Sequence, residues 1–322
     1  MLASSAAPSG EPLHPPAGAR SSALDSLASV ILELGSIPSG GRLLVLSSLC
    51  GWPARTTSVS FTSESELWVG GFSGAGDSWG FAGSPGGQGV LVTSLTPSCI
   101  PHGLPLEVGT GGRVGFSLET SLDPALLTLS VALPDDSVLV LNPDSAGIYV
   151  LDAVERGVYW IEASNATASG PEVVMLLPLL SGVTVQDAMG KCMGMREPSA
   201  WTLAEVASAF DSIRTAHGLE PARRSALLDS IAGCRASDIA MAGRVSHSGL
   251  DSIALPEGLP AAENIGRGRT FSEALSMILT SPAHLSSCLS TRWESAGWGA
   301  RVQVERDGWQ VVLVGIMCEG SP

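Results

Sequence analysis

The chain has 322 residues, of which 44% are hydrophobic, so it can bury a sizeable core. Seventeen basic residues against 31 acidic ones give a formal net charge of −14 at pH 7. No cluster of Lys or Arg could follow a phosphate backbone, so we predict no nucleic-acid partner and no adsorption to anionic membranes. No apolar run approaches the roughly 20 residues that cross a bilayer, so we also predict no transmembrane segment.

The first residues are predicted to form a disordered leader over residues 1–22. This stretch is rich in Pro, Ser and Ala, and it has neither the basic nor the apolar segment of a signal peptide. We expect it to be what remains after a signal has been removed. An α/β region of unknown role follows over residues 23–100. It begins with a helix whose apolar residues recur at helical spacing from Leu24 to Leu34, and which ends at Gly35.

Residues 101–183 are predicted to form an immunoglobulin-like β-sandwich. Strand-like runs recur about every 8–12 residues and are separated by turn sequences, which is typical of such domains. The run from Gly157 to Ala163 is typical of a late strand of an accessory domain of this kind. We expect the sandwich to act as a spacer or partner-binding module. The six predicted strands are 113–118, 126–133, 137–141, 147–151, 157–163 and 172–180.

The composition changes again over residues 190–322. Capping boxes at Thr202 and Thr270 predict the starts of two helices. Pro221 is predicted to begin another helix, whose inner face includes Leu227 and Cys234. Two terminal strands are joined by a turn at residues 307–308. The predicted class of the whole chain is therefore α+β and multi-domain.

The six cysteines are too widely spaced for a zinc ribbon or a C-x-x-C redox motif. A single lysine, together with abundant Ser and Gly, favours disulfides in an exported protein; reduced cysteines in the core are the alternative. Several pairings are possible, and we expect the local ones: Cys50–Cys99, Cys192–Cys234 and Cys288–Cys318.

Two histidines and one glutamate are the candidate site residues. His247 lies after a predicted helix, His284 lies at the start of a helical turn, and Glu263 lies between them. Two imidazoles and one carboxylate from three element ends can form an open site for a metal, most often zinc. Ser246 is not expected to be a hydrolase nucleophile, because it does not lie in a G-x-S-x-G elbow and because adjacent residues such as Ser246 and His247 rarely form a nucleophile–base pair. Glu294 is expected to be a solvated carboxylate.

Five short segments strengthen this choice. They are Arg214-Thr-Ala-His-Gly-Leu-Glu-Pro, Cys234-Arg-Ala-Ser-Asp-Ile-Ala with Ser246-His247, Ala262-Glu-Asn-Ile, Ser281-Pro-Ala-His and Arg292-Trp-Glu-Ser-Ala-Gly-Trp-Gly. In this order they resemble motifs of the CAP superfamily (cysteine-rich secretory protein, antigen 5 and pathogenesis-related 1; SCP-like). The resemblance covers about residues 204–317 and is nearest to the bacterial secreted branch.

The resemblance implies an α-β-α sandwich with a cleft that holds two histidines and up to two acids. Carried over to this chain, the cleft residues are His247, Glu263 and His284. The second acid of animal members has no counterpart here, because the helix before His284 carries only Glu273, which is expected to cap it. The constellation therefore has three of its four groups.

We predict a secreted, periplasmic or cell-surface CAP-like protein that is not an enzyme. It binds a small molecule, lipid, glycan or protein in the cleft, where one zinc ion can be held by His247, Glu263 and His284. In the alternative interpretation, the protein is a zinc-dependent hydrolase with Glu263 as general base. In a further one, it is a structural cell-surface protein with a vestigial cleft.

Overall fold

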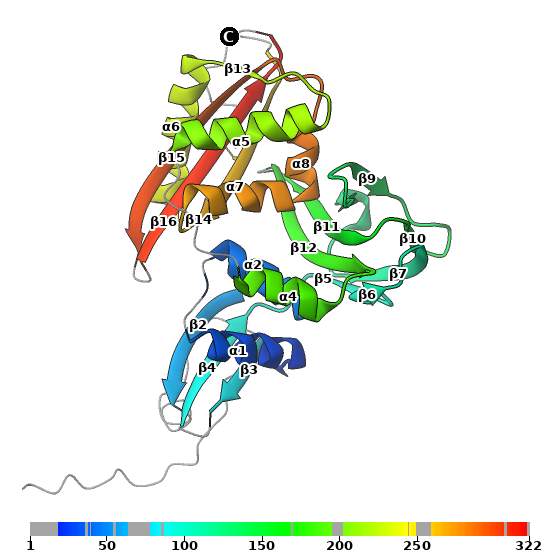
Figure 1. Cartoon of the computed structure of the whole chain (residues 1–322). Coiled ribbons are helices and arrows are strands. Elements are labelled where there is room, and N and C mark those ends of the chain that lie inside the picture. The colour runs from blue at the N-terminus through cyan, green and yellow to red at the C-terminus, as the bar shows by residue number, and fades with distance from the viewer. Residues whose placement is uncertain are drawn as a thin grey trace, which may run out of the picture. The chain divides into compact units, whose positions relative to one another are not determined.

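A computed structural model describes residues 19–35, 38, 40–53, 56–63, 78–84, 87–168, 170–194, 202–243, 245–248, 259–305 and 308–320. The α+β class is confirmed, since the chain contains helices together with several sheets whose strands are mostly antiparallel (Figure 1). The chain divides into two compact units, Met1–Ile37 with Arg55–Thr96, and Pro38–Ala54 with Pro97–Pro322. The segment Pro38–Ala54, which we assigned to the N-terminal region, thus groups with the later strands. The other predicted limits stay predictions.

The first unit contains one helix packed on a four-stranded sheet. Its elements are β1 (Ala19–Arg20), α1 (Ser22–Leu34), β2 (Thr56–Ser63), β3 (Ser78–Gly83) and β4 (Gln88–Ser94), and the strand order is β1-β3-β4-β2. Helix α1 ends at Gly35 with φ 65°, as its sequence predicts, because glycine adopts the left-handed conformation at low cost. Most of the predicted leader, residues 1–18, lies outside the described residues, while Ala19–Arg20 form β1 and Ser22 begins α1.

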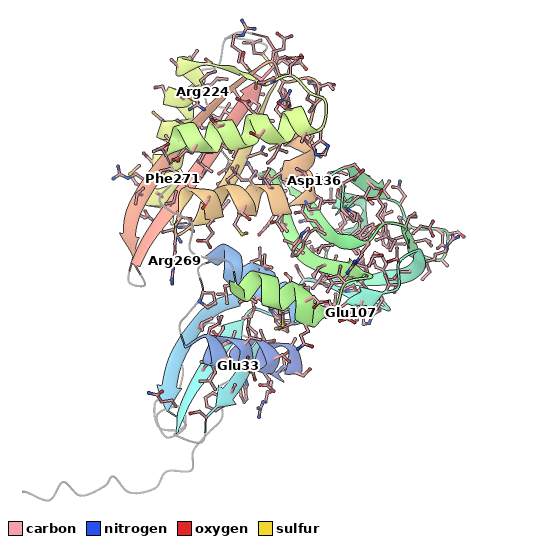
Figure 2. The ribbon with its side chains drawn as sticks, in the orientation of Figure 1. Glu33, Glu107, Asp136, Arg224, Arg269 and Phe271 are labelled. Atoms are coloured by element: carbon pink, nitrogen blue, oxygen red, sulfur yellow. The ribbon has the colours of Figure 1, made fainter. Side chains whose placement is uncertain are left out.

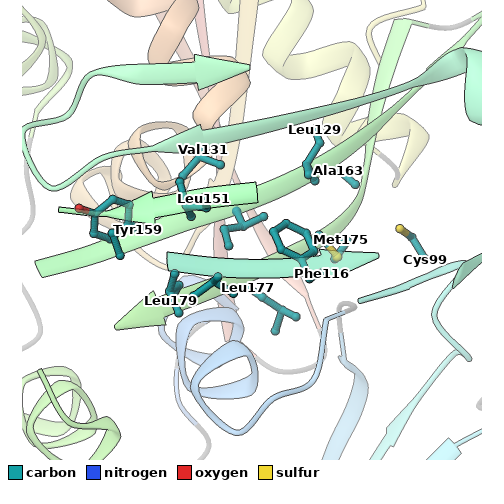
Figure 3. Packing of buried hydrophobic residues seen from close by; sticks show 13 residues of the cluster. Cys99, Phe116, Leu129, Val131, Leu151, Tyr159, Ala163, Met175, Leu177 and Leu179 are labelled. Atoms are coloured by element: carbon teal, nitrogen blue, oxygen red, sulfur yellow. The ribbon is translucent and has the colours of Figure 1, made fainter. Parts of the chain in front are cut away.

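Strands of the second unit form two sheets that share one core. One sheet has the order β10-β7-β5 and the other β6-β12-β11-β8-β9. Apolar side chains such as Phe116, Leu151 and Tyr159 fill the space between them (Figure 3). The strands are β5 (Cys99–His102), β6 (Glu107–Val108), β7 (Gly112–Thr120), β8 (Leu127–Ala132), β9 (Val138–Leu141), β10 (Tyr149–Ala153), β11 (Gly157–Thr167) and β12 (Gly170–Ser181), with a 3-10 turn at Pro124–Leu126.

Residues 203–318 form a sheet of order β13-β15-β16-β14 with helices on both faces. Side chains of β16 alternate between the two faces, so Leu313 packs with α5 and α7 while Val314 packs with α6. The elements are α5 (Leu203–Ala216), β13 (Arg223–Arg224), α6 (Ala226–Ala242), β14 (Ala261–Gly268), α7 (Phe271–Thr280), α8 (Pro282–Cys288), β15 (Ser295–Glu305) and β16 (Gly308–Cys318).

Helices α5 and α7 both begin at the predicted threonines, but the capping box is complete at Thr202 and not at Thr270. Thr202 accepts a hydrogen bond from the Glu205 amide at the start of α5, and the Glu205 carboxylate accepts one from the Thr202 amide. At α7 the Glu273 carboxylate accepts from the amide of Arg269, which Figure 2 labels near Phe271. These bonds satisfy amides that have no partner within the helix.

Helix α6 differs in detail from its prediction. It begins after Ser225 rather than at Pro221, and Leu227 and Cys234 lie on its exposed side. Its buried face includes Leu228, Ala232, Ala236 and Ile239, which pack on the sheet. The approach is close, since a Cβ on Gly299 would lie 2.1 Å from the Gly233 nitrogen.

Helices α2 (Gly40–Leu49) and α4 (Val185–Gly194) complete the second unit. The Ser48 hydroxyl donates to the Leu176 carbonyl at 3.0 Å, which ties α2 to β12. The Glu107 carboxylate, labelled in Figure 2, accepts from the Val185 amide at the start of α4. None of the helices in the described part of the chain has the length and apolar character needed to cross a membrane.

Candidate functional site

A buried ion pair between α6 and β14 forms the floor of the site. Arg235 Nε lies 2.7 Å from Glu263 Oε1, and Arg235 Nη2 lies 3.1 Å from Glu263 Oε2. The Glu263 side chain is fully buried and that of Arg235 is 9% exposed. A planar guanidinium matches both carboxylate oxygens at once, so this geometry is strong and directional. Arg235 also donates to the Ser246 carbonyl and so holds the segment that carries His247.

His247 uses one ring nitrogen to contact the same carboxylate. Its Nδ1 lies 3.0 Å from Glu263 Oε2, and its side chain is 15% exposed. This contact orients the imidazole and leaves Nε2 for another partner. The His284 ring, from α8, lies nearby, with 6.0 Å between the ring centroids and 55° between the ring planes. The structure thus brings together the three residues that the sequence singled out.

The pKa of Glu263 reflects competing effects. Burial raises it, but the hydrogen bonds from His247 and Arg235 and their positive charge outweigh burial and hold it below its ordinary value. Glu263 is therefore a carboxylate that stays ionised and has no free oxygen.

The three residues line a cavity of about 420 Å³, which we call the site cavity. One wall comes from β14, α8 and the segment at His247, and includes Asn264 and Ser287. The opposite wall comes from the β-sandwich, through Glu162 and Ser164 of β11 and residues at the turn between β11 and β12. A Cβ on Gly170 would lie 2.7 Å from the Cβ of His247, so the small residue lets the turn close over the histidine.

Glu162 is the functional candidate that sequence reasoning missed. It is completely buried, and neither carboxylate oxygen has a hydrogen-bond partner of normal geometry. Burial raises its pKa to about 6, although Ser281 and the Ala283 backbone lower it in part. Glu162 alternates with Tyr159, Ile161 and Ala163, which face the sandwich core. Its sequence position therefore indicates the outer face of the sandwich, which in this chain is covered by α8.

Other candidates lie outside the site cavity. Glu294 is exposed and pairs with Arg223 at 3.8 Å, as expected for a solvated carboxylate. Ser246 Oγ lies 2.8 Å from Ser248 Oγ. The hydrogen bonds of the described residues do not join the Ser246 hydroxyl to an imidazole. Glu273 caps α7, as predicted.

The residues fit a zinc ion if Glu263 orients His247, but not if Glu263 is itself a zinc ligand. A carboxylate on Nδ1 of a histidine is the usual outer-shell arrangement for an imidazole that binds zinc through Nε2, so Glu263 fits as an orienting group. It does not fit as a third ligand, because Arg235 and His247 already occupy its oxygens. Over the described residues, no three His, Cys, Asp or Glu side chains are arranged to hold a metal ion.

The expected disulfides are not formed in the structure. The thiols of Cys50, Cys99, Cys234, Cys288 and Cys318 are free, and the Cys192 side chain lies outside the described residues. Cys288 packs on the α7 face of the C-terminal sheet and accepts a hydrogen bond from Asn264 at 3.2 Å, whereas Cys318 packs on the α6 face. The two side chains therefore belong to different packed clusters, one on each face of the sheet, and no bridge joins them.

Comparisons with known proteins add the following. No protein-family profile matches the chain, and no curated protein matches it. Among solved structures, an outer surface protein from Borrelia burgdorferi is 15% identical and matches 36% of this chain and 90% of its own, with a TM-score of 0.32. A cysteine-rich secretory protein from Staphylococcus aureus is 14% identical and matches 65% of this chain and 76% of its own, with a TM-score of 0.29.

An extracellular protein containing an SCP domain, from Bacillus anthracis, is 11% identical to this chain. That match covers 69% of this chain and 85% of the other, with a TM-score of 0.30. TM-scores below 0.5 at such identities do not establish a family for the chain. The class that the fold itself defines is an α+β protein whose site cavity lies between a β-sandwich and a helix-covered sheet.

Proposed function

We propose that the chain is an exported, CAP-like ligand-binding protein without catalytic activity, and that the site cavity is its binding site. The observation that carries this proposal is the convergence of His247, Glu263 and His284 on one cavity that the sandwich closes. A volume of about 420 Å³ is within the range of small-molecule sites. Export rests on the composition of the chain and on the sequence resemblance.

The geometry favours binding over hydrolysis. A general base needs a pKa near the working pH and a lone pair that reaches the attacking water. Glu263 has its pKa held low, its side chain is fully buried, and both its oxygens are paired. A hydrolase that uses Glu263 as its base is therefore disfavoured.

His247 and His284 are the residues that would hold a zinc ion, and Glu263 would orient His247. When bound, the ion would supply a positive charge and an open coordination position for a ligand atom. Without metal, the two imidazoles still offer a donor or an acceptor to a polar ligand.

Calorimetric titration of the full chain with zinc chloride at pH 7.5 tests this role of the site. We expect uptake by the wild type and its loss in His284→Ala. The matched control is His102→Ala, because the His102 side chain is 56% exposed and lies outside the site cavity. Equal zinc uptake by His284→Ala and wild type would place the ion elsewhere and contradict the proposal.

A second experiment separates the three classes of function. The full chain is screened against a library of small organic compounds by ligand-observed NMR, and against ester, peptide and glycoside substrates with and without a chelator. Binding without turnover supports the proposal. Chelator-sensitive turnover would instead establish a hydrolase, and a chain that binds neither zinc nor any compound would be a structural protein.

A further inference from the structure

Among the described residues that line the site cavity, Glu162 is the one charged group for which the described contacts give no opposite charge. It lies on β11 of the sandwich, is completely buried, and neither of its oxygens makes a hydrogen bond of normal geometry. An ionised carboxylate removed from water without a partner is costly, and proteins keep such groups chiefly where they act.

The other charges near the site cavity are already compensated. Arg235 and Glu263 form a bidentate pair, so together they contribute no net charge. The described residues that line the cavity include no Lys and no Arg. Among the described Asp, Glu, Lys and Arg side chains that line the cavity, Glu162 is therefore the one whose charge no described contact compensates. An anionic ligand would face this charge at low dielectric, whereas a cation would neutralise it.

We propose that the site cavity takes a positively charged ligand, and that Glu162, supplied by the β-sandwich, is the carboxylate that receives the charge. This inference rests on the proposed binding function and names its ligand class. Two sources share this chemistry: a divalent metal ion bound by the two imidazoles, whose charge Glu162 would balance without coordinating it, and the ammonium group of a small organic molecule. In either case the binding site needs both the sandwich and the C-terminal sheet.

A purely structural role is the competing explanation. Ser281 and the backbone of Ala283 lie at the start of α8 and act on the pKa of Glu162, so the carboxylate could serve only to dock the sandwich on α8. Ser281 already caps this helix, since its hydroxyl accepts from the His284 amide at 3.4 Å. Docking predicts that removing the charge of Glu162 weakens the fold and leaves binding unchanged, while the present proposal predicts the reverse.

The test is calorimetric titration of the full chain with zinc chloride in one arm and with spermidine and choline in the other. The variants are wild type, Glu162→Gln and, as matched control, Glu172→Gln. Glu172 is an exposed glutamate on the paired strand β12, in register with Asn165 of β11. Removal of one charge-assisted contact is expected to weaken cation binding by about tenfold or more in Glu162→Gln, and not in Glu172→Gln.

The arm that shows this loss identifies the source of the charge. The inference is overturned if Glu162→Gln binds these cations as tightly as the wild type, or if the wild type binds none of them. Zinc uptake that depends on His284 but not on Glu162 would leave the proposed function standing and remove this inference alone. Binding of only uncharged compounds in the NMR screen would have the same consequence.

Discussion

Strands β11 and β14 each bury one glutamate at the same cavity, and the two carboxylates behave in opposite ways. Glu263 on β14 has a bidentate arginine and a histidine, and its pKa is held below the ordinary value despite burial. Glu162 on β11 has no such partner, and burial raises its pKa to about 6. Burial alone does not decide the state of a carboxylate, since an opposite charge in contact reverses its effect.

The difference separates two roles. The wall from the C-terminal sheet is internally balanced and can hold His247 in place in the absence of any ligand. The wall from the sandwich carries the Glu162 carboxylate, which has no opposite charge in contact. We expect this charge to lower the free energy of unfolding, a cost that many functional sites bear. If the two carboxylates differ in this way, substitutions at the two walls should change stability in opposite directions.

The largest effect is expected from breaking the balanced pair. Arg235→Met leaves the Glu263 charge buried without its main partner, which typically costs about 3–5 kcal/mol of unfolding free energy. Urea unfolding measures this loss, with the exposed Arg301→Met as control. In the double variant Arg235→Met with Glu263→Gln, most of the stability should return. If Arg235→Met alone is as stable as the wild type, the Arg235–Glu263 pair does not stabilise the fold and this prediction is wrong.

An effect of opposite sign is expected from Glu162→Gln. The pKa of Glu162 rises from 4.5 to about 6 on folding, so the folded protein binds the proton more tightly. The contribution of Glu162 to stability is then complete below pH 4.5 and is lost as pH rises through 6. A shift of this size corresponds to about 2 kcal/mol.

Urea unfolding of Glu162→Gln and wild type between pH 4 and pH 8 tests this sign. From pH 4.5 upward the free energy of unfolding of the variant should rise relative to that of the wild type. Above pH 6 the difference between the two should become constant. In the same pH range the Glu263 carboxylate should show no comparable transition, because its pKa lies below 4.5 in the folded protein. A variant that is less stable than the wild type at pH 8 would contradict the idea of an unpaired charge.

The smallest effect is expected at Ser281, which serves both walls. Its hydroxyl caps α8 and also lowers the pKa of Glu162. Ser281→Ala should cost about 1 kcal/mol through the lost cap and should raise the pKa of Glu162 further. The matched control is Ser276→Ala, at an exposed position inside α7. Carboxyl NMR titration of Glu162 measures the pKa change, and an unchanged value would remove Ser281 from the site.

Local patterns in the sequence determined much of this protein. Capping boxes at Thr202 and Thr270 predicted the starts of α5 and α7, because the bonds of a helix start lie within four residues. Strand-like runs about every 8–12 residues, separated by turn sequences, predicted β7 to β12. Short segments around His247, Glu263 and His284 predicted three of the residues that line the cavity.

Partners from distant parts of the chain could not be predicted in this way. Arg235 is separated from Glu263 by 28 positions, and nothing in the α6 segment distinguishes a buried arginine from an exposed one. The predicted Cys288–Cys318 pair failed for a related reason, since the two side chains pack on opposite faces of the C-terminal sheet.

Glu162 shows most clearly where local sequence patterns stop predicting the environment of a side chain. Strand alternation determined that it points away from Tyr159 and Ile161, toward the outer face of the sandwich. Whether that face meets water or protein depends on the packing of α8 against β11, which no local pattern encodes. Local sequence thus fixes the direction of this side chain, whereas the burial of its charge depends on which distant segment packs over it.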